Sequence, residues 1–428
     1  MKTAKLRRAQ QAALILLVLA GLINSLDRST LAIANSSITA EMGLTASEMG
    51  WLLSAFSLPY AFAQLPMGVL LDRLGARIAL GLGILLWSLA QLAGGFVRGL
   101  NQLFAARVVL GIGEAPQFPA AAKVVSEWFA VKERGRPTGI IVASTTIAPA
   151  LAPPLLTGMM LLFGGWRGMF VAMGALGVAV GVAWYAVFRD RNSVPLTEDE
   201  IRYLQDGDIE SNAAPMSAAE WRGLFTQRTV WAMILGFMGV IYMIWLYLTW
   251  LPAYLERERG LSLTSSGWIV AIPYLGGTLG MLSSGWVADA LLARGLTPIA
   301  SRKWPVCVGL VFAALFTVPA AYTPSLPLAI LFISLALFFV NLACGGAWAL
   351  VSVAAPRRLV ASLGSVQNFG GYLGGSAAPI LTGVIVDSTH SFVNALLISA
   401  AVSLAGALIY LFGVKDPVVS VGRVEAQT

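Results

Sequence analysis

Runs of about 20 apolar residues recur along almost the whole chain, and they limit its possible folds more than any other feature. A helix needs about that many residues to cross roughly 30 Å of hydrocarbon at about 1.5 Å per residue. The runs are too long and too uniformly apolar to be the alternating strands of a membrane β-barrel. They cover approximately residues 12–34, 49–71, 78–97, 101–124, 137–162, 166–187, 229–252, 265–290, 304–321, 326–350, 360–386 and 391–413. The sequence therefore predicts an all-α polytopic membrane protein with twelve transmembrane helices.

The composition agrees with burial in a bilayer. Of the 428 residues, 57% are hydrophobic and 11% are charged, whereas soluble domains carry roughly 25% charged residues. A water-soluble globule is therefore excluded. Basic residues precede the first apolar run as they do in a secretory signal, but the pair Asp27–Arg28 interrupts the run. We expect this run to be kept as the first transmembrane helix.

Lysine and arginine are distributed unevenly between the two sides of the predicted membrane. If the amino terminus lies inside, 22 of the 28 basic residues fall in cytoplasmic segments. Positively charged loops resist translocation, so we expect both termini in the cytoplasm. The net charge of +7 then reflects this topology and requires no nucleic acid or acidic partner.

The longest polar stretch, residues 188–228, divides the predicted helices six and six. Two blocks of residues recur on either side of it in the same order. Gly50, Trp51 and Asp72 match Gly267, Trp268 and Asp289 at an offset of 217, and residues 154–158 match 379–383 at an offset of 225. This duplication predicts a first bundle over 1–187, a cytoplasmic linker over 188–228 and a second bundle over 229–428. Parallel six-helix halves are the architecture of major facilitator transporters.

A short motif at residues 68–77 closes the second predicted helix and opens the third. It resembles the loop signature of the major facilitator superfamily, with Asp72 and Arg77 at its acidic and basic positions. An aspartate near a helix end can bond to a helix terminus or to an arginine in one conformation only. We interpret Asp72 and Arg77 as gating residues, with Asp289 as the counterpart of Asp72 in the second half. A solvated turn is the alternative.

Four charged residues within the predicted helices form the most informative set: Asp27, Arg28, Arg107 and Glu114. A lone charge at bilayer depth is costly, so such groups usually face a cavity and mark a transport pathway. Arg107 and Glu114 lie two turns apart on one helix face. Our hypothesis is that the four converge, that the arginines attract an anion and that the carboxylates exchange protons. Static ion pairing between two helices is the alternative.

The whole chain also resembles a narrower family, the anion:cation symporters, which includes bacterial galactonate, hexuronate and organic-acid carriers. The resemblance rests on Asp27–Arg28, Tyr60, the block from Arg107 through Gly111–Glu114 to Phe118–Pro119, Trp128–Phe129, Glu133–Arg136, Gly346–Trp348 and Gln367–Gly371. It implies proton-driven uptake of an organic anion at a bacterial inner membrane. Asp27 and Glu114 then match the proton-linked carboxylates, and Arg107 matches the arginine that couples them. Substrate-binding positions are matched by Arg28, Tyr60, Trp348 and Asn368, although Tyr60 and Trp348 also fit aromatic packing.

The sequence defines the substrate less closely than the family. Sugar-acid carriers tend to place hydroxyl or amide side chains where this sequence has Gly345, Ala347 and the short Thr145, which we include among the substrate-binding residues. This pattern favours a smaller or less hydroxylated carboxylate or sulfonate, such as sulfoacetate or an aromatic acid, over a sugar acid. An anion antiporter, a proton-coupled exporter and a transport-inactive nutrient sensor are alternatives with the same fold.

No motif of an enzyme is present. The sequence lacks a zinc motif, a nucleophile elbow and a phosphate-binding loop. Cys307 and Cys344 lie in predicted helices and form no paired ligand motif, and His390 falls in a short loop. We therefore expect neither a metal nor a cofactor, and we expect a functional monomer whose partners are the anion, protons and lipid.

Overall fold

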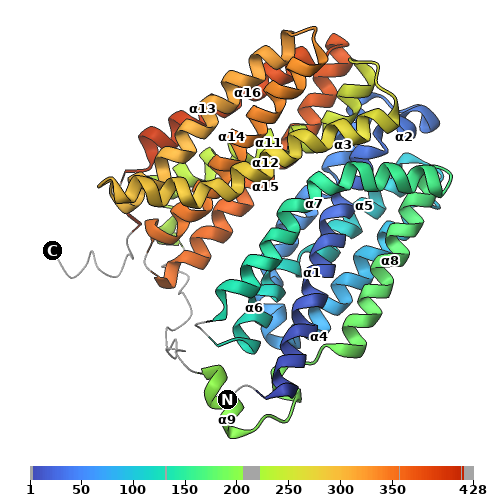
Figure 1. Ribbon diagram of the computed structural model, residues 1–428. Helices are drawn as coiled ribbons and strands as arrows, with labels where there is room; N and C mark the ends of the chain where they lie inside the picture. The colour runs from blue at the N-terminus through green and yellow to red at the C-terminus, as the bar shows by residue number, and fades with distance from the viewer. Residues whose placement is uncertain (1–2, 131–132, 206–221, 356, 416, 419–428) are drawn as a thin grey trace. The chain divides into compact units, whose positions relative to one another are not determined.

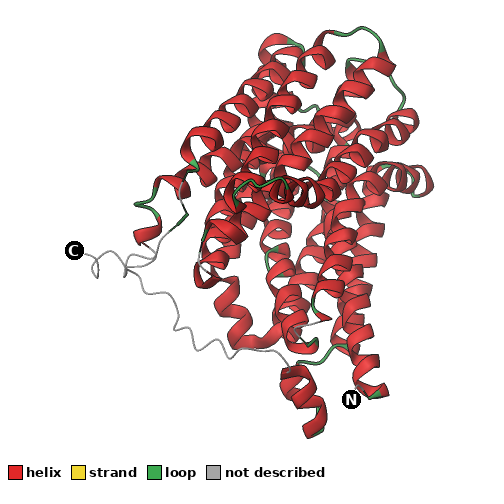
Figure 2. Ribbon diagram, turned by 60° about the vertical axis from the view of Figure 1, so that its left-hand side comes forward, coloured by secondary structure: helices red, strands yellow, loops and turns green. Residues whose placement is uncertain are grey.

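The computed structural model describes residues 3–130, 133–205, 222–355, 357–415 and 417–418 (Figure 1). Within these ranges every regular element is helical (Figure 2), which confirms the all-α prediction. The helices of the first half are α1 (Ala4–Ile33), α2 (Asn35–Met42), α3 (Ala46–Ser54), α4 (Ser57–Gly94), α5 (Leu100–Glu114), α6 (Gln117–Trp128), α7 (Gly135–Leu162) and α8 (Trp166–Val187). The linker contains a 3-10 turn, η2 (Arg191–Ser193), and α9 (Glu198–Gln205). The second half contains α11 (Arg228–Arg257), α12 (Leu263–Ala293), α13 (Pro298–Tyr322), α14 (Leu326–Ala354), α15 (Arg357–Thr389) and α16 (Val393–Gly413).

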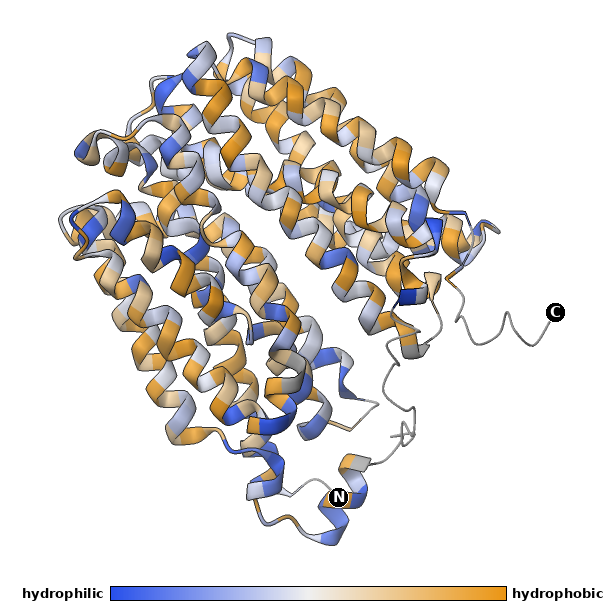
Figure 3. Ribbon diagram, turned by 180° about the vertical axis from the view of Figure 1, so that it is seen from behind, coloured by the Kyte–Doolittle hydropathy of each residue, from blue (hydrophilic) through white to orange (hydrophobic). Residues whose placement is uncertain are grey.

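A helix or a pair of helices lies at each of the twelve predicted spans. Nine of the described helical segments are long and apolar enough to cross a bilayer by length and composition, and hydrophobic residues cover most of the length of the long helices (Figure 3). The three remaining positions are α3 with the first part of α4, α5 with α6, and α12. α5 and α6 are 15 and 12 residues long, so each alone is too short to cross a bilayer. Glycine and serine lower the mean hydropathy of α12.

Residue contacts divide the chain into two compact units. Unit 1 comprises Met1–Met42 and Ala55–Asn212, and unit 2 comprises Gly43–Ser54 and Ala213–Thr428. In unit 1, α4 packs against α5 and α8, and α1 packs against α7. In unit 2, α14 packs against α12 and α13, and α11 packs against α15 and α16. The linker residues 206–221 lie outside the described ranges.

Unit 2 also contains α3, which packs against α15. A Cβ at Gly50 would lie 2.4 Å from the main-chain oxygen of Pro379, so only glycine permits this close approach. The carboxylate of Asp387 accepts hydrogen bonds from the main-chain N–H groups of Ala46 and Ser47, over 2.8 and 2.7 Å. Asp387 therefore caps the amino-terminal end of α3, where the free N–H groups of a helix attract an anion.

Helix α4 is interrupted at Gly75, where φ is 77° and ψ is 164°. This left-handed conformation favours glycine. A Cβ at this position would also lie 2.6 Å from a carboxylate oxygen of Asp190. The break falls between the second and third predicted spans, inside the motif at residues 68–77.

Candidate functional site

Four charged side chains from α1 and α5 meet in the interior of unit 1. The Nε atom of Arg28 donates a hydrogen bond to Oε2 of Glu114 over 2.8 Å. The Nη1 atom of Arg107 donates to the main-chain oxygen of Asp27 over 3.3 Å. Asp27 and Glu114 are fully buried and Arg107 is 3% exposed, whereas the side chain of Arg28 is 14% exposed. Arg28 is therefore the member of the cluster that is most accessible from outside the packed interior.

The local helix geometry places Glu114 at a helix end. It is the last residue of α5, and Pro116 separates α5 from α6 because proline has no main-chain N–H to continue the helix. A Cβ at Gly111, one turn earlier, would lie 2.4 Å from the main-chain oxygen of Phe56. The glycine thus lets α5 approach the turn that precedes α4. This approach brings Phe56 to the charged cluster.

Two aromatic rings support the arginines. The guanidinium carbon of Arg28 lies 4.9 Å from the ring centroid of Phe56 and 4.8 Å from that of Tyr60. The guanidinium carbon of Arg107 lies 5.8 Å from the Phe56 centroid. The two rings stack with their centroids 5.3 Å apart, and Gln64 donates a hydrogen bond to the Tyr60 hydroxyl over 2.7 Å. Cation–π attraction therefore holds both guanidinium groups against one aromatic pair.

Sequence reasoning selected Tyr60 but missed Phe56, although the two are one helical turn apart and both are buried. The available signal was the aromatic pair at i and i+4 beside two membrane arginines.

Several buried polar atoms of the cluster have no hydrogen-bond partner among the described residues. They are both carboxylate oxygens of Asp27, Oε1 of Glu114 and Nε of Arg107. Burying such groups without partners is costly, so proteins usually satisfy them with water or another group. Asn24 is fully buried one turn before Asp27 and Arg28. Sequence reasoning did not select Asn24, but an amide one turn from a membrane carboxylate was a usable signal.

Hydrogen bonds fix the main chain of α1 at the cluster. The hydroxyl of Thr30 donates to the main-chain oxygen of Asp27 over 2.7 Å, and the amide of Gln91 on α4 donates to that hydroxyl over 3.1 Å. The same Asp27 oxygen accepts the bond from Arg107. These contacts hold α1 in register with α4 and α5 beside the charged groups.

Thr145 lies on α7, next to α1. A Cβ at Gly21 would lie 3.4 Å from the Thr145 methyl group and 3.5 Å from the Gln117 amide nitrogen. The Thr145 hydroxyl donates to the main-chain oxygen of Val142 over 2.9 Å. Thr145 therefore lies on the side of α7 that faces α1. Its hydroxyl already makes one hydrogen bond within its own helix.

The remaining two predicted substrate residues lie in unit 2. Trp348 on α14 is 41% exposed, and its ring meets Phe237 edge to face at a centroid distance of 5.9 Å. A Cβ at Gly364 on α15 would lie 3.6 Å from the Trp348 ring. Asn368, one turn beyond Gly364, is half-buried. Trp348 and Asn368 thus occupy neighbouring parts of α14 and α15.

The structure removes part of the argument for a less hydroxylated substrate. A Cβ at Gly345 would lie 2.0 Å from the hydroxyl oxygen of Ser284, so Gly345 permits tight packing of α14 on α12. Ala347 is fully buried. Neither position faces open space, so helix packing accounts for the small residues there. The preference for a less hydroxylated anion stays a prediction.

The predicted gating residues take part in surface contacts. The amine of Lys123 pairs with the carboxylate of Asp72 over 3.0 Å, and Asp289 pairs with Arg302 over 3.7 Å. Both aspartate side chains are 77% exposed. Arg77 donates from its guanidinium to the main-chain oxygen of Tyr185 over 2.9 Å. The sequence analysis did not predict the pairing of Lys123 with Asp72.

Within the described ranges, no group of three or more histidine, cysteine, aspartate or glutamate side chains is placed to hold a metal ion. Cys307 and Cys344 are buried and unlinked.

Comparison with known proteins identifies the family of this sequence. The sequence model described as Major Facilitator Superfamily matches residues 17–379. The chain is 47% identical over 417 residues to the probable L-galactonate transporter of Escherichia coli strain K12, covering 97% of this chain and 92% of the relative. It is 33% identical over 423 residues to the D-galactonate transporter of Escherichia coli O6:H1, covering 96% and 97%.

The fold has solved counterparts. A bacterial homologue of the human lysosomal transporter Spinster, in an inward-facing and occupied conformation, matches with a TM-score of 0.76 and 20% identity over 95% of this chain and 97% of that one. The family and the named relatives are transporters rather than enzymes, as the sequence predicted. The chain therefore belongs to the Major Facilitator Superfamily of membrane transporters.

Proposed function

We propose that this transporter takes up a sugar acid of the galactonate type together with protons, by alternating access. The ion pair between the partly buried Arg28 and the fully buried Glu114, with the unsatisfied carboxylate of Asp27 beside it, is the observation that carries this proposal. The names of the two galactonate transporters among the relatives support the substrate class. The buried packing of Gly345 and Ala347 removes the main sequence argument against a hydroxylated anion.

Competition for one guanidinium explains how an anion and a proton can be coupled. In the observed state Arg28 is held by Glu114. When Glu114 takes up a proton, its attraction for Arg28 weakens, and the guanidinium becomes free to bind a substrate carboxylate bidentately. Phe56 and Tyr60 keep the guanidinium in place during this exchange. Proton uptake and anion binding thereby favour one another.

Asp27 and Arg107 form the second part of the proposed coupling site. An ionised Asp27 is a buried charge whose oxygens lack a hydrogen bond from any described residue. Such a charge needs a nearby cation or a proton, and Arg107 already contacts the main chain of the same residue. We assign Asp27 and Glu114 as proton carriers and Arg107 as the group that couples them.

Tyr60, Thr145, Trp348 and Asn368 stay our proposed substrate-binding residues. Tyr60 and Thr145 offer hydroxyl groups in unit 1, and Trp348 and Asn368 offer an indole and an amide in unit 2. An aromatic face suits the C–H side of a sugar acid, and an amide suits its hydroxyl groups.

Exposed ion pairs make suitable gates because each contributes little stability and opens at low cost. We assign Asp72, Arg77 and Asp289 to this role, on the basis of the contacts of Asp72 with Lys123 and of Asp289 with Arg302. The distribution of basic residues supports cytoplasmic termini in a bacterial inner membrane. The repeat supports two halves, 1–187 and 229–428, joined by the linker 188–228, in a functional monomer.

Uptake by purified protein in liposomes tests the function. L-Galactonate, D-galactonate, sulfoacetate and benzoate are compared with and without an inward proton gradient, with the membrane potential held at zero. We expect a galactonate to accumulate above its external concentration only when the gradient is present. Exchange that does not depend on pH would instead identify an antiporter. Accumulation of sulfoacetate or benzoate alone would contradict the proposed substrate class.

A further inference from the structure

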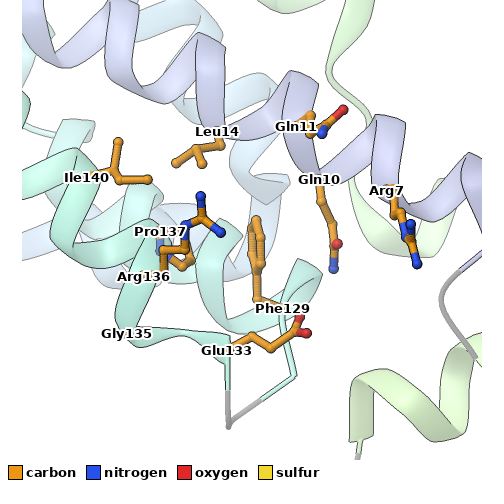
Figure 4. A pocket seen from close by; sticks show the side chains of 10 residues that line it. All are labelled: Arg7, Gln10, Gln11, Leu14, Phe129, Glu133, Gly135, Arg136, Pro137 and Ile140. Carbon is orange, nitrogen blue, oxygen red and sulfur yellow. The ribbon is translucent and has the colours of Figure 1, made fainter.

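A cavity of about 670 Å³ opens at the amino-terminal end of α1, far from the charged cluster. Its walls come from the first turns of α1, from the chain that follows α6 and from the first turns of α7 (Figure 4). The side chains that line it include Arg7, Gln11, Phe129, Glu133 and Arg136. The volume lies in the range of small-molecule pockets, which is roughly 300–1,000 Å³.

This cavity is distinct from the proposed transport site. None of the four clustered charged residues lines it. Leu14, the lining residue of α1 nearest to the cluster, precedes Arg28 by fourteen residues of one helix, which corresponds to about 20 Å. A molecule in the cavity therefore cannot touch the charged cluster.

Hydrogen bonds fix two of the walls. The amide of Gln10 on α1 donates to the main-chain oxygen of Trp128 over 2.5 Å. The guanidinium of Arg134 donates to the main-chain oxygens of Phe129 and Ser126, over 3.0 and 2.7 Å. Hydrogen bonds therefore stabilise the main chain that bounds the cavity, and the shape of the cavity does not depend on side-chain packing alone.

The charges of the lining favour an anion. Arg7 and Arg136 have no ion-pair partner among the residues that the structure describes, and Glu133 is the one acidic residue of the lining. In Figure 4 the Arg136 guanidinium points into the space beside Leu14. An arginine suits a carboxylate, Gln11 can bond to hydroxyl groups, and Phe129 offers an apolar face.

We propose that this cavity is a second binding station for the hydroxylated carboxylate, on the cytoplasmic side of the transport site. The inference rests on the proposed function for the identity of the anion and the side of the membrane. An anion released from Arg28 toward the cytoplasm meets this cavity, whose nearest α1 residue, Leu14, lies about four turns from Arg28 and whose Arg7 lies about six turns away. The station raises the local concentration of the anion at the inner mouth and so limits net release.

Equilibrium binding of radiolabelled L-galactonate to the full-length protein in phosphatidylcholine nanodiscs tests the station. The wild type should show two classes of site. Arg28→Ala should remove the tighter class and leave the weaker one. Adding Arg7→Gln and Arg136→Gln to Arg28→Ala should weaken the residual binding about tenfold, because charge-assisted contacts are lost. Glu133→Gln should tighten it, since it removes the single negative charge but keeps a polar side chain.

Arg8→Gln provides a matched control, because Arg8 is an exposed neighbour on α1 that does not line the cavity. It should leave the residual binding unchanged. Two results would overturn the station and leave the proposed function intact. One is the loss of all binding in Arg28→Ala, and the other is residual binding that does not change when Arg7 and Arg136 are replaced. In the wild type, weak binding without the tighter class would instead contradict the proposed function. Absence of any binding by the wild type would contradict both.

An anionic lipid head group also suits the arginines of the cavity. A second experiment distinguishes this occupant from a soluble carboxylate. The Arg28→Ala variant is measured again in discs that contain phosphatidylglycerol. Residual galactonate binding should persist there. If it disappears, a lipid head group occupies the cavity, and the proposal of a station for a soluble carboxylate is wrong.

Discussion

The two units of this transporter bury different chemistry. In the described part of unit 1 the interior near α1 and α5 contains Asp27, Arg107 and Glu114. In the described part of unit 2, the buried polar residues are hydroxyl and amide side chains, such as Thr249 and Gln367. The sequence repeat predicts that the halves share an origin. We infer that the charged interior of unit 1 handles the anion and the protons, and that unit 2 offers uncharged polar and aromatic groups.

The largest effect should follow removal of the cation that binds the anion. We expect Arg28→Ala to weaken L-galactonate binding about a hundredfold, because truncating one partner of a buried charged pair costs about 3 kcal/mol. Calorimetry in nanodiscs measures this loss. Arg98→Ala, in the exposed loop between α4 and α5, is the control and should leave the affinity unchanged. Equal losses in the two variants would mean that Arg28 has no special role.

Loss of the aromatic support should have the next largest effect. Phe56→Leu removes a ring that faces both guanidinium groups at 4.9 and 5.8 Å. Cation–π contacts in desolvated sites are worth roughly 1–2 kcal/mol, so we expect about tenfold weaker binding. The effect should grow in Glu114→Gln, where Arg28 has lost its charged partner and depends more on the aromatic rings.

Phe56→Tyr keeps the aromatic ring and should restore most of the affinity. If Phe56→Leu has the same effect with and without Glu114→Gln, the ring serves only packing, and the role of unit 1 in presenting Arg28 is weaker than we infer.

A change in unit 2 should alter selectivity and leave the pH dependence of uptake unchanged. Trp348 is 41% exposed beside Gly364 on α15. Its truncation in Trp348→Ala should change the ratio of L-galactonate to D-galactonate uptake by roughly threefold, in line with the loss of about 0.7 kcal/mol of aromatic contact. Trp348→Phe is the conservative control. A shift in the pH profile of Trp348→Ala would break the division of roles between the halves.

The smallest effect concerns an exposed carboxylate of unit 1. Hydrogen bonds from Arg167 and Trp166 hold the pKa of Glu41 below its ordinary value of 4.5. A depressed pKa stabilises the folded state above the unfolded value, and this stabilisation is lost as the pH falls through the folded value. Glu41→Gln should therefore lower the Tm slightly near neutral pH and leave it unchanged in acid. A Tm difference that increases in acid would contradict this assignment and link Glu41 to another group.

Much of the framework could be predicted from the sequence because membrane helices depend on local composition. The apolar runs located the spans, and the rarity of charge at bilayer depth selected Asp27, Arg28, Arg107 and Glu114. The structure brings all four together. Their proton and substrate roles remain predictions, and the liposome and binding measurements test them.

Long-range packing could not be predicted in the same way. Nothing in the span 49–71 indicated that Gly50 would press against Pro379, or that Asp387 would cap α3. The identity of the small residues Gly345 and Ala347 does not tell whether they face a substrate or a neighbouring helix. The structure shows that both positions are packed against other residues, and no local sequence pattern predicts this burial.

Accumulation driven by a pH gradient in the Asp27→Asn variant tests the central claim most directly. Liposomes containing this variant are assayed for uptake against a concentration gradient and, in parallel, for exchange of labelled for unlabelled L-galactonate. The account predicts that exchange persists while gradient-driven accumulation is lost, because the substrate cation remains and one proton carrier is gone. Undiminished accumulation in Asp27→Asn would contradict the assignment of proton coupling to the charged interior of unit 1.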